Sequence, residues 1–169
     1  GRALFIAGIR AASVAAIFSP LTGASEERAR DILAQECPDC SVTLSHRIGR
    51  VGLLERENAA LLNASLGPLA QHTTQAFRDA LAGSGLEAKL YLTQNDGTVL
   101  LADRAERYPV FSFASGPTNS MRGAAFLSGR PDGMVADVGG TTTDVGMLQG
   151  GFPREAHGFE SVVKQNARR

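Results

Sequence analysis

The chain has 169 residues, of which 43% are hydrophobic, enough to build the core of one ordinary domain or parts of two. Its 17 basic residues balance 17 acidic residues, so no overall charge attracts it to nucleic acid or to an anionic membrane. No uninterrupted apolar run reaches the roughly 20 residues that cross a bilayer. We therefore expect neither nucleic acid nor a membrane among its partners.

The first 20 residues are apolar but include Arg2 and Arg10, which is not typical of a signal peptide. They predict a buried strand over Ala3–Ser13, followed by a loop that ends near Gly23. The chain opens without Met and inside this apolar stretch. We therefore expect it to be an internal or processed piece of a longer protein.

A helix and a second strand are predicted next. Ser25 is a capping residue, and Glu26 and Glu27 follow it where acidic side chains favour the start of a helix, so we predict a helix over residues 25–36. Residues 41–48 alternate apolar and polar side chains, as a strand with one covered face does.

Cys37 and Cys40 lie between these elements in the string CPDC. Two cysteines are too few for a disulfide framework, so we expect a reducing, cytoplasmic location. Their spacing is that of redox motifs, but they follow a helix instead of preceding one, so we interpret them as free loop thiols and keep a redox or metal role as the alternative. The scattered histidines His46, His72 and His157 predict no zinc site.

A long helical region follows, with a bend at Gly67-Pro68. Its apolar residues recur near helical spacing; they are Leu54, Leu61, Leu62, Leu66, Leu69, Phe77 and Leu81. We expect the leucines of the run ERENAALLNASL, residues 55–66, to pack within the parent fold instead of forming an exposed interaction helix. Short strands are predicted at residues 89–93, 99–102 and 108–114.

A further helix is predicted over residues 119–128 and a strand over residues 134–138. Ser115, in the string SGP before this helix, lacks the setting of a nucleophile and is expected to form a turn. Arg122 is close in sequence to the strand that follows, so it is a candidate contact for a bound anion, with a surface or interlobe salt bridge as the simpler interpretation. The alternation of strands and helices indicates an α/β fold.

The most informative string is MVADVGGTTTDVGML, residues 134–148. Gly139 and Gly140 leave the backbone uncovered, so its N–H groups can approach a phosphate, and the hydroxyls of residues 141–143, all threonine, add donors. Asp137 leaves the first half-strand and Asp144 enters the second, so a tight hairpin brings both carboxylates together, where they suit Mg²⁺ or Mn²⁺. The alternative is an ordinary Gly-Gly turn with threonines and aspartates selected for strand and turn propensity.

The string D-V-G-G-T-T-T-D-V, residues 137–145, resembles the D-x-G-G-T-[ST]-T-D-V motif of the hydantoinase A/5-oxoprolinase family. SGPTNSMRGAA, residues 115–125, is similar to that family's SGP segment. ERENAALLNASLGPLA, residues 55–70, and YLTQNDG, residues 91–97, resemble family blocks in the same order. The resemblance covers most of the chain.

The resemblance implies a portion of an actin-like, ribonuclease H-like ATPase fold, with a mixed sheet and flanking helices. Residues 1–114 would be an α/β segment from the end of the first lobe with interlobe helices, and residues 115–169 the start of the second lobe with the Gly-Thr hairpin. The family's other phosphate hairpin has no counterpart in this sequence, so we expect the isolated chain to be a poor catalyst.

The resemblance also implies a function, namely the ATP-dependent opening of a cyclic amide such as hydantoin or 5-oxoproline. Gly139, Gly140, Thr141, Thr142 and Thr143 would hold the ATP phosphates. Asp137 and Asp144 would be the catalytic and metal-binding residues, with Mg²⁺ or Mn²⁺.

Other functions remain open at this point. The chain could belong to an acetone carboxylase-like subunit, to a nucleotide-binding regulatory module of the actin-like superfamily, or to an inactive fragment that self-associates. Its expected partners are the remaining lobes or a second subunit of the enzyme, with a homo-oligomer as a further possibility.

Overall fold

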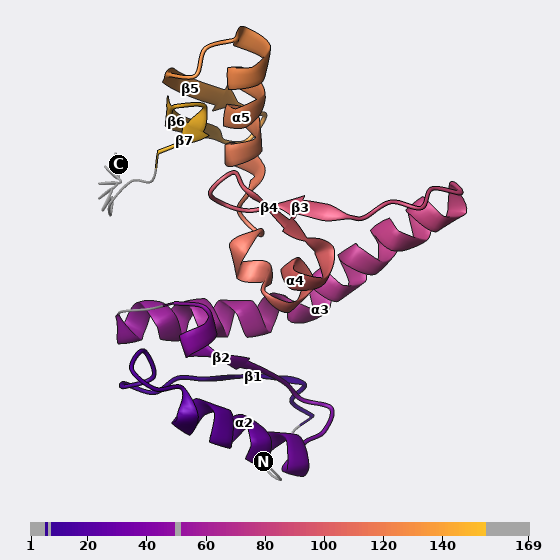
Figure 1. Cartoon of the computed structure of the whole chain (residues 1–169), viewed down its shortest axis with the longest axis vertical. Coiled ribbons are helices and arrows are strands. Elements are labelled where there is room, and N and C mark those ends of the chain that lie inside the picture. The colour runs from indigo at the N-terminus through magenta and orange to yellow at the C-terminus, as the bar shows by residue number, and fades with distance from the viewer. Residues whose placement is uncertain (1–5, 7, 50–51, 155–169) are drawn as a thin grey trace, which may run out of the picture. The chain divides into compact units, whose positions relative to one another are not determined.

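The computed structural model describes residue 6 and residues 8–49 and 52–154. These residues form two compact units, divided between Ser115 and Gly116 (Figure 1). None of the helices in the described ranges is both long enough and apolar enough to cross a bilayer.

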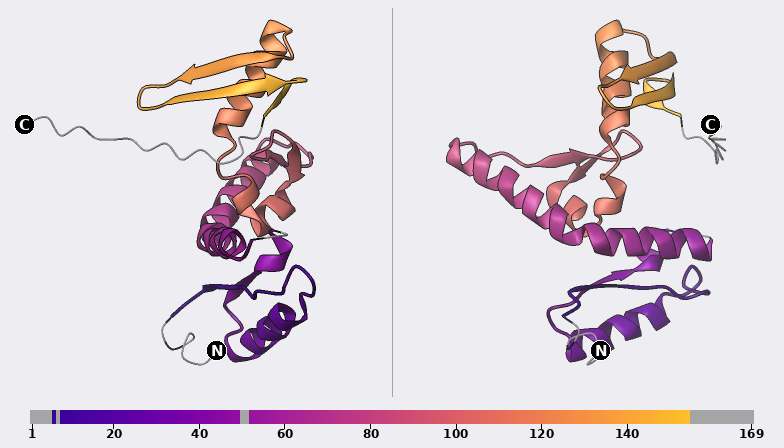
Figure 2. Two further views of the ribbon diagram at one scale, coloured as in Figure 1. Left: turned by 90° about the vertical axis from the view of Figure 1, so that its left-hand side faces the viewer. Right: turned by 180° about the vertical axis from the view of Figure 1, so that it is seen from behind.

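Unit 1 begins with two parallel strands joined by a helix. Strands β1 (Ala11–Val14) and β2 (Ser41–Leu44) pair in register from Ala11 opposite Ser41 to Val14 opposite Leu44, and helix α2 (Ala24–Glu36) connects them. Figures 1 and 2 show α2 on one face of this pair and the first half of a long helix on the other. Most of the strand predicted over Ala3–Ser13 lies outside β1, and residues 1–5 and 7 lie outside the described residues.

The prediction of helix α2 is confirmed, but its cap is not the one expected. The helix begins at Ala24 after Gly23, without a side-chain capping bond, and Ser25 lies inside the first turn. A side chain at Gly23 would collide with the ring of His46, because a Cβ atom there would lie 2.7 Å from His46 Nε2. Close packing of His46, and not capping chemistry, therefore accounts for the residue before this helix.

The strand predicted over residues 41–48 is too long. Strand β2 ends at Leu44, and Ser45–Arg47 form a short 3₁₀ helix, η1. Ser45 and His46 leave the strand direction because both bind the carboxylate of Glu26.

Helix α3 spans Leu53–Gly83 and contains Pro68. Figures 1 and 2 show it bent, as the Gly67-Pro68 pair predicts, since proline removes one backbone hydrogen bond and crowds the preceding turn. Several of its leucines are exposed in this chain, since Leu54 is 69% exposed and Leu61 is 61% exposed. The expectation that the leucines of residues 55–66 pack within the parent fold stays a prediction. The buried positions of α3 are instead Arg56, Ala60, Asn63, Ala64 and Thr74.

Unit 1 ends with a small hairpin and two short helical segments. Strands β3 (Tyr91–Thr93) and β4 (Val99–Leu101) are antiparallel, and α4 (Ala102–Arg107) and the 3₁₀ helix η2 (Pro109–Phe111) follow. The strand predicted over residues 108–114 is absent from the described structure. Asn63 accepts a hydrogen bond from the N–H of Val110, and the Asn95 amide donates to Val110 O, so side chains satisfy backbone groups that a strand would have paired.

Unit 2 is a helix packed on a three-stranded antiparallel sheet (Figure 1). Helix α5 (Gly116–Ser128) starts three residues before the predicted helix. Strands β5 (Gly133–Val138) and β6 (Thr143–Gln149) form the long hairpin, and β7 (Phe152–Pro153) pairs with the end of β6.

Candidate functional site

The β5–β6 hairpin places two carboxylates opposite each other. Asp137 and Asp144 are direct partners in the antiparallel register, and both are half-buried. Facing residues in such a pair have Cβ atoms roughly 4.5–5.5 Å apart. The prediction that the hairpin brings these two side chains together is therefore confirmed.

The loop between them is narrow and exposed. It closes through a hydrogen bond of 2.9 Å from the N–H of Gly139 to the carbonyl of Thr142, and all five residues from Gly139 to Thr143 are exposed. Neither Gly139 nor Gly140 has a positive φ, and a Cβ atom at Gly140 would meet nothing within 4 Å. A positive φ and close internal packing therefore do not account for glycine at position 140, and without a side chain its backbone is open to approach from outside.

The loop presents several free hydrogen-bond donors. Gly139 uses its N–H inside the turn, so it is not among them. Within the described residues, the backbone N–H groups of Gly140 and Thr141 have no protein acceptor, and neither do the three threonine hydroxyls. Adjacent N–H groups with nearby hydroxyls suit the oxygens of a phosphate.

The two aspartates fit a divalent cation. Like charges directly opposite each other destabilise a strand pair, and a cation between them removes this cost. Among the described residues no cluster of three or more His, Cys, Asp or Glu side chains is suited to hold a metal. A metal held by Asp137 and Asp144 would therefore take its other ligands from water or phosphate, which is how Mg²⁺ is often bound.

Helix α5 supports the hairpin from one side. Gly146 lies on the same strand face as Asp144, and a Cβ atom there would overlap Sδ and Cε of Met121. Arg122 donates to Gly151 O at 2.5 Å, and its guanidinium lies 4.0 Å from the centre of the Phe152 ring. In this structure Arg122 thus holds the β6–β7 turn instead of the phosphate loop.

A hollow of about 480 Å³ in unit 2 runs along α5 and β5. Its lining ends at Ala136, one residue before Asp137. The loop from Gly139 to Thr143 lies outside this hollow, and all five of its residues are exposed.

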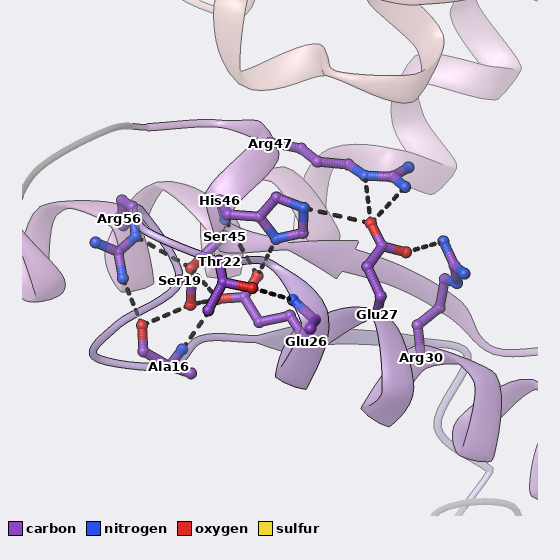
Figure 3. Close-up of polar contacts among 11 residues, drawn as sticks. Ala16, Ser19, Thr22, Glu26, Glu27, Arg30, Ser45, His46, Arg47 and Arg56 are labelled. Atoms are coloured by element: carbon purple, nitrogen blue, oxygen red, sulfur yellow. Dashed lines mark hydrogen bonds and ion pairs between the residues drawn. The ribbon is translucent and has the colours of Figure 1, made fainter.

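A second polar cluster, in unit 1, was not anticipated from the sequence. Glu26 is fully buried, and its carboxylate accepts from Ser19, from Ser45 at 2.6 Å and from the His46 N–H at 3.1 Å (Figure 3). The His46 ring contacts it as well, with Nδ1 at 2.8 Å from Oε2. The Ala16 N–H donates to it at 3.0 Å.

Arg56 joins this cluster from α3. It is 2% exposed, and it donates to Ser45 Oγ at 3.2 Å and to Ala16 O at 2.7 Å. Burial disfavours the charged form of Glu26, but hydrogen bonds from Ser19, Ser45 and His46 outweigh burial and lower the pKa of Glu26 to about 2. The carboxylate is thus fully satisfied and ionised at neutral pH.

This cluster has the composition of a catalytic site but not its geometry. The hydroxyls of Ser19 and Ser45 donate to Glu26, and neither is bonded to His46, so there is no paired nucleophile and base. Its members come from the β1–α2 loop, α2, η1 and α3, which it ties together. We assign it a structural role.

Cys37 and Cys40 are free and buried in the loop between α2 and β2. The N–H of Cys40 donates to Cys37 O at 3.0 Å, which closes a turn. Burial, followed by the neighbouring Cys37, raises the pKa of the Cys40 thiol. A thiol with a raised pKa is a weak nucleophile, so the interpretation as unreactive loop thiols is favoured over a redox role.

Comparison with known proteins identifies relatives of this architecture. A family profile described as hydantoinase/oxoprolinase matches residues 56–165. The acetophenone carboxylase gamma subunit of Aromatoleum aromaticum is 29% identical over 156 residues, which is 87% of this chain and 21% of that protein. An uncharacterised protein of Methanocaldococcus jannaschii is 28% identical over 139 residues, 80% of this chain and 20% of that protein.

Two solved structures share the fold. The nucleotide-free structure of acetone carboxylase, from a study of ATP-dependent acetone carboxylation, has a TM-score of 0.73 at 22% identity and covers 89% of this chain. The ATP-dependent caprolactamase of Pseudomonas jessenii has a TM-score of 0.67 at 18% identity and covers 85% of this chain. The chain spans about a fifth of the length of the relatives it matches, 20–21% of the curated proteins and 21–22% of the solved chains.

Proposed function

The chain belongs to the hydantoinase/oxoprolinase family, and on this premise we propose that its β5–β6 hairpin is one half of the ATP phosphate site of an enzyme that opens cyclic amides. The observation that supports this most directly is the pairing of Asp137 with Asp144 beside an uncovered Gly-Thr loop. A hairpin selected only for turn formation has no need of two facing carboxylates, which repel each other.

In this proposal each part of the hairpin has a separate task. The N–H groups of Gly140 and Thr141 and the hydroxyls of Thr141, Thr142 and Thr143 donate to phosphate oxygens, and Gly139 shapes the turn and lets the phosphate approach. Asp137 and Asp144 are the catalytic carboxylates, and they hold Mg²⁺ or Mn²⁺ directly or through water. The metal supplies positive charge that neutralises the phosphates during their transfer.

We further propose that the fold is part of an actin-like ATPase. Residues 1–114 then belong to the end of the first lobe and the interlobe helices, and residues 115–169 open the second lobe. The remaining lobes or a second subunit supply the facing phosphate hairpin and the substrate residues. The exposure of all five residues of the loop from Gly139 to Thr143 supports this division, since a facing hairpin would cover them.

The proposed substrate is a cyclic amide of the hydantoin or 5-oxoproline type. Similarity to the ATP-dependent caprolactamase, named for a cyclic amide, supports this class. A carboxylase subunit is the second candidate, because acetone carboxylase and the acetophenone carboxylase gamma subunit are matched over a similar share of the chain. Assays of the whole protein separate the two: ATP turnover stimulated by a hydantoin without bicarbonate indicates the hydrolase, and turnover that needs a ketone and bicarbonate indicates the carboxylase.

Calorimetric titration of Mg·ATP tests the phosphate site. Asp137→Ala is expected to weaken binding to the chain at least tenfold, because it removes one of two carboxylates that hold the cation. Gly140→Ala is expected to weaken binding as well, because the added methyl group stands where the phosphate approaches. Circular dichroism should show both variants folded, since Asp137 is only half-buried and a Cβ atom at Gly140 meets nothing within 4 Å.

Thr98→Ala, an exposed threonine in the β3–β4 loop, is the control and should bind like the unmodified chain. Binding of Mg·ATP that both Asp137→Ala and Gly140→Ala leave unchanged would overturn the assignment of this loop. A folded chain that binds neither Mg·ATP nor Mg·ADP would show that the site needs the facing hairpin, and the two variants would then be tested in the whole protein.

A further inference from the structure

We propose that unit 1 contains a docking site for a partner protein, in which a short, extended, acidic peptide segment adds to the free edge of strand β2. A hollow of about 250 Å³ lies along this edge. All four residues of β2 line it and none of the residues of β1 does, so it lies on the side of β2 opposite β1. The residues of its recorded lining all belong to unit 1.

This β2-edge hollow is bounded from both faces of the strand pair. Helix α2 contributes Arg30 and helix α3 contributes Asn63, and Figures 1 and 2 show these two helices on opposite faces. The end of α4 forms a further wall. It is fixed beside β2, because the Asn63 amide donates to Thr43 Oγ1 at 3.1 Å and to Arg107 O at 3.2 Å. A segment entering the hollow would therefore lie beside β2.

Val42 offers a backbone donor and a backbone acceptor on this edge. In a paired strand each residue directs its N–H and C=O to one side, and the next residue directs them to the other. The N–H of Ser41 donates to Arg10 O on the β1 side at 2.8 Å, so the N–H and C=O of Val42 point to the hollow. Neither group has a hydrogen-bond partner among the described residues, and Val42 is only half-buried.

The residues of β2 do not protect this edge. Natural edge strands are often blocked by lysine, by proline or by a β-bulge. The strand SVTL contains neither a charge nor proline, and its register with β1 is continuous, so it has no bulge. Leu44 is 3% exposed, so the accessible edge ends there and pairs with a short segment only. An unpaired edge of this kind is a template for the addition of another extended chain.

One positive charge in the hollow is unmatched. The other charged side chains of the lining form ion pairs, namely Arg30 and Arg47 with Glu27, and Asp103 and Glu106 with Arg78. Arg107 is exposed and has no ion pair within the described part of the chain, and its guanidinium lies 5.7 Å from the centre of the Tyr108 ring. A carboxylate on the docked segment would match this charge, which is why the proposed segment is acidic.

Two labelled peptides test the charge preference. The first is an acetylated, fluorescein-labelled pentapeptide of alternating threonine and valine with a central glutamate, and the second has glutamine in place of the glutamate. In anisotropy titrations of the 169-residue chain, the glutamate peptide should bind about threefold more tightly, the effect of one partly exposed ion pair. Arg107→Gln should make the two affinities equal. Arg104→Gln, at an exposed α4 position outside the lining, is the control and should keep the preference.

Two N-methylated forms of the glutamate peptide test whether the segment binds as a strand. Successive N–H groups of an extended chain point to opposite sides, so methyl groups on alternate nitrogens either face β2 or face away from it. One form should lose binding and the other should keep it. The bound peptide should also slow hydrogen exchange at the Val42 amide, which gains an acceptor. The Gly140 amide, likewise without a protein acceptor among the described residues, is the control and should exchange at an unchanged rate.

The unmodified chain decides the question even if Arg107→Gln fails to fold. Equal binding of the two N-methylated forms, or an unchanged exchange rate at Val42, would show that the peptide does not pair with β2 and would overturn the proposal. Equal affinity for the glutamate and glutamine peptides, or binding of neither at millimolar concentration, would do the same. The measurements contain no nucleotide, so they do not depend on the phosphate hairpin.

Discussion

At the scale of single residues, unit 1 is organised around a buried charge. Glu26 is fully buried, and Ser19, Ser45, His46 and the Ala16 N–H donate to it (Figure 3). Such a carboxylate stabilises a fold only when all its hydrogen bonds are made, because an unpaired buried charge is very costly. Glu26 therefore joins α2 to the β1–α2 loop and to η1, and Arg56 ties α3 to the same cluster through Ser45 and Ala16.

The cluster makes the stability of unit 1 depend on pH. The pKa of Glu26 is about 2 in the folded chain against an ordinary value of 4.5, so between these values the unfolded chain binds the proton and the folded chain does not. Stability contributed by Glu26 is complete above about pH 4.5 and is lost as the pH falls towards 2. The loss is about 3 kcal/mol at 1.36 kcal/mol per unit of pKa.

Urea unfolding of the chain at pH 7, 4 and 3, followed by circular dichroism, measures this dependence. Glu26→Gln should be destabilised at pH 7 and should lose less stability than the unmodified chain between pH 7 and 3. Glu57→Gln, at an exposed position of α3, is the matched control and should retain the full dependence. Identical pH profiles for Glu26→Gln and the unmodified chain would show that Glu26 is not the titrating group.

At the scale of elements, helix α5 packs closely against strand β6 because Gly146 has no side chain. Gly146 of β6 has no positive φ, so its backbone does not require glycine. The reason for glycine is Met121 of α5, whose Sδ and Cε occupy the space of a Cβ atom. The orientation of the strand that carries Asp144 is thus linked to the packing of the helix beneath it.

Gly146→Val is expected to destabilise unit 2 by about 1–3 kcal/mol through overpacking. The double variant Met121→Ala, Gly146→Val removes the methionine side chain that collides with the valine, so it should recover part of the lost stability. Amide hydrogen exchange of β5 and β6 gives the measurement, because it reports the opening of this hairpin directly.

Gly123→Ala is the control within the same unit. This α5 position has nothing within 4 Å of a Cβ atom, so alanine should be neutral or stabilising by up to about 1 kcal/mol. Equal protection of the hairpin in Gly146→Val and Gly123→Ala would contradict the packing explanation.

At the scale of the whole molecule, the chain exposes a large amount of apolar surface. One face of the β5–β6 hairpin presents four exposed apolar side chains, Met134, Val138, Val145 and Met147, opposite the face that packs on α5. Exposed apolar surface of this kind promotes association. The balanced charge of 17 basic and 17 acidic residues provides no net repulsion against it.

We therefore expect the chain to self-associate in a concentration-dependent way. Sedimentation velocity between about 10 μM and 500 μM should show a rising average mass. The double variant Val138→Thr, Val145→Thr keeps strand propensity and should lower the association constant several-fold. Thr93→Val, on β3 in unit 1, is the control variant, because it changes a strand residue outside the β5–β6 hairpin. A chain that stays monomeric at all concentrations would refute this expectation.

Much of the local structure follows from the sequence alone. The string D-V-G-G-T-T-T-D-V predicts the hairpin, its turn and the meeting of Asp137 with Asp144, because the two strands and the loop are adjacent in the chain. The order of β1, α2 and β2 and the bend at Pro68 follow for the same reason, since their signals are the spacing of apolar residues, the acidic residues Glu26 and Glu27 in the first turn of α2, and the backbone N–H that proline lacks. The motif also indicates the family, which the comparison confirms over residues 56–165.

What only the tertiary structure decides is which residues are buried together. Helix α3 turns Arg56 and Asn63 inwards and exposes Leu54 and Leu61, against the pattern of hydrophobicity, because their partners lie on β2, η1 and the segment around η2. Side-chain contacts with residues distant in the chain also end β2 at Leu44 and replace the strand predicted over residues 108–114. Partners 7 to 47 residues away in the chain leave no periodic signal, so the Glu26 cluster and the burial of Ser112 Oγ emerge only once the chain is folded.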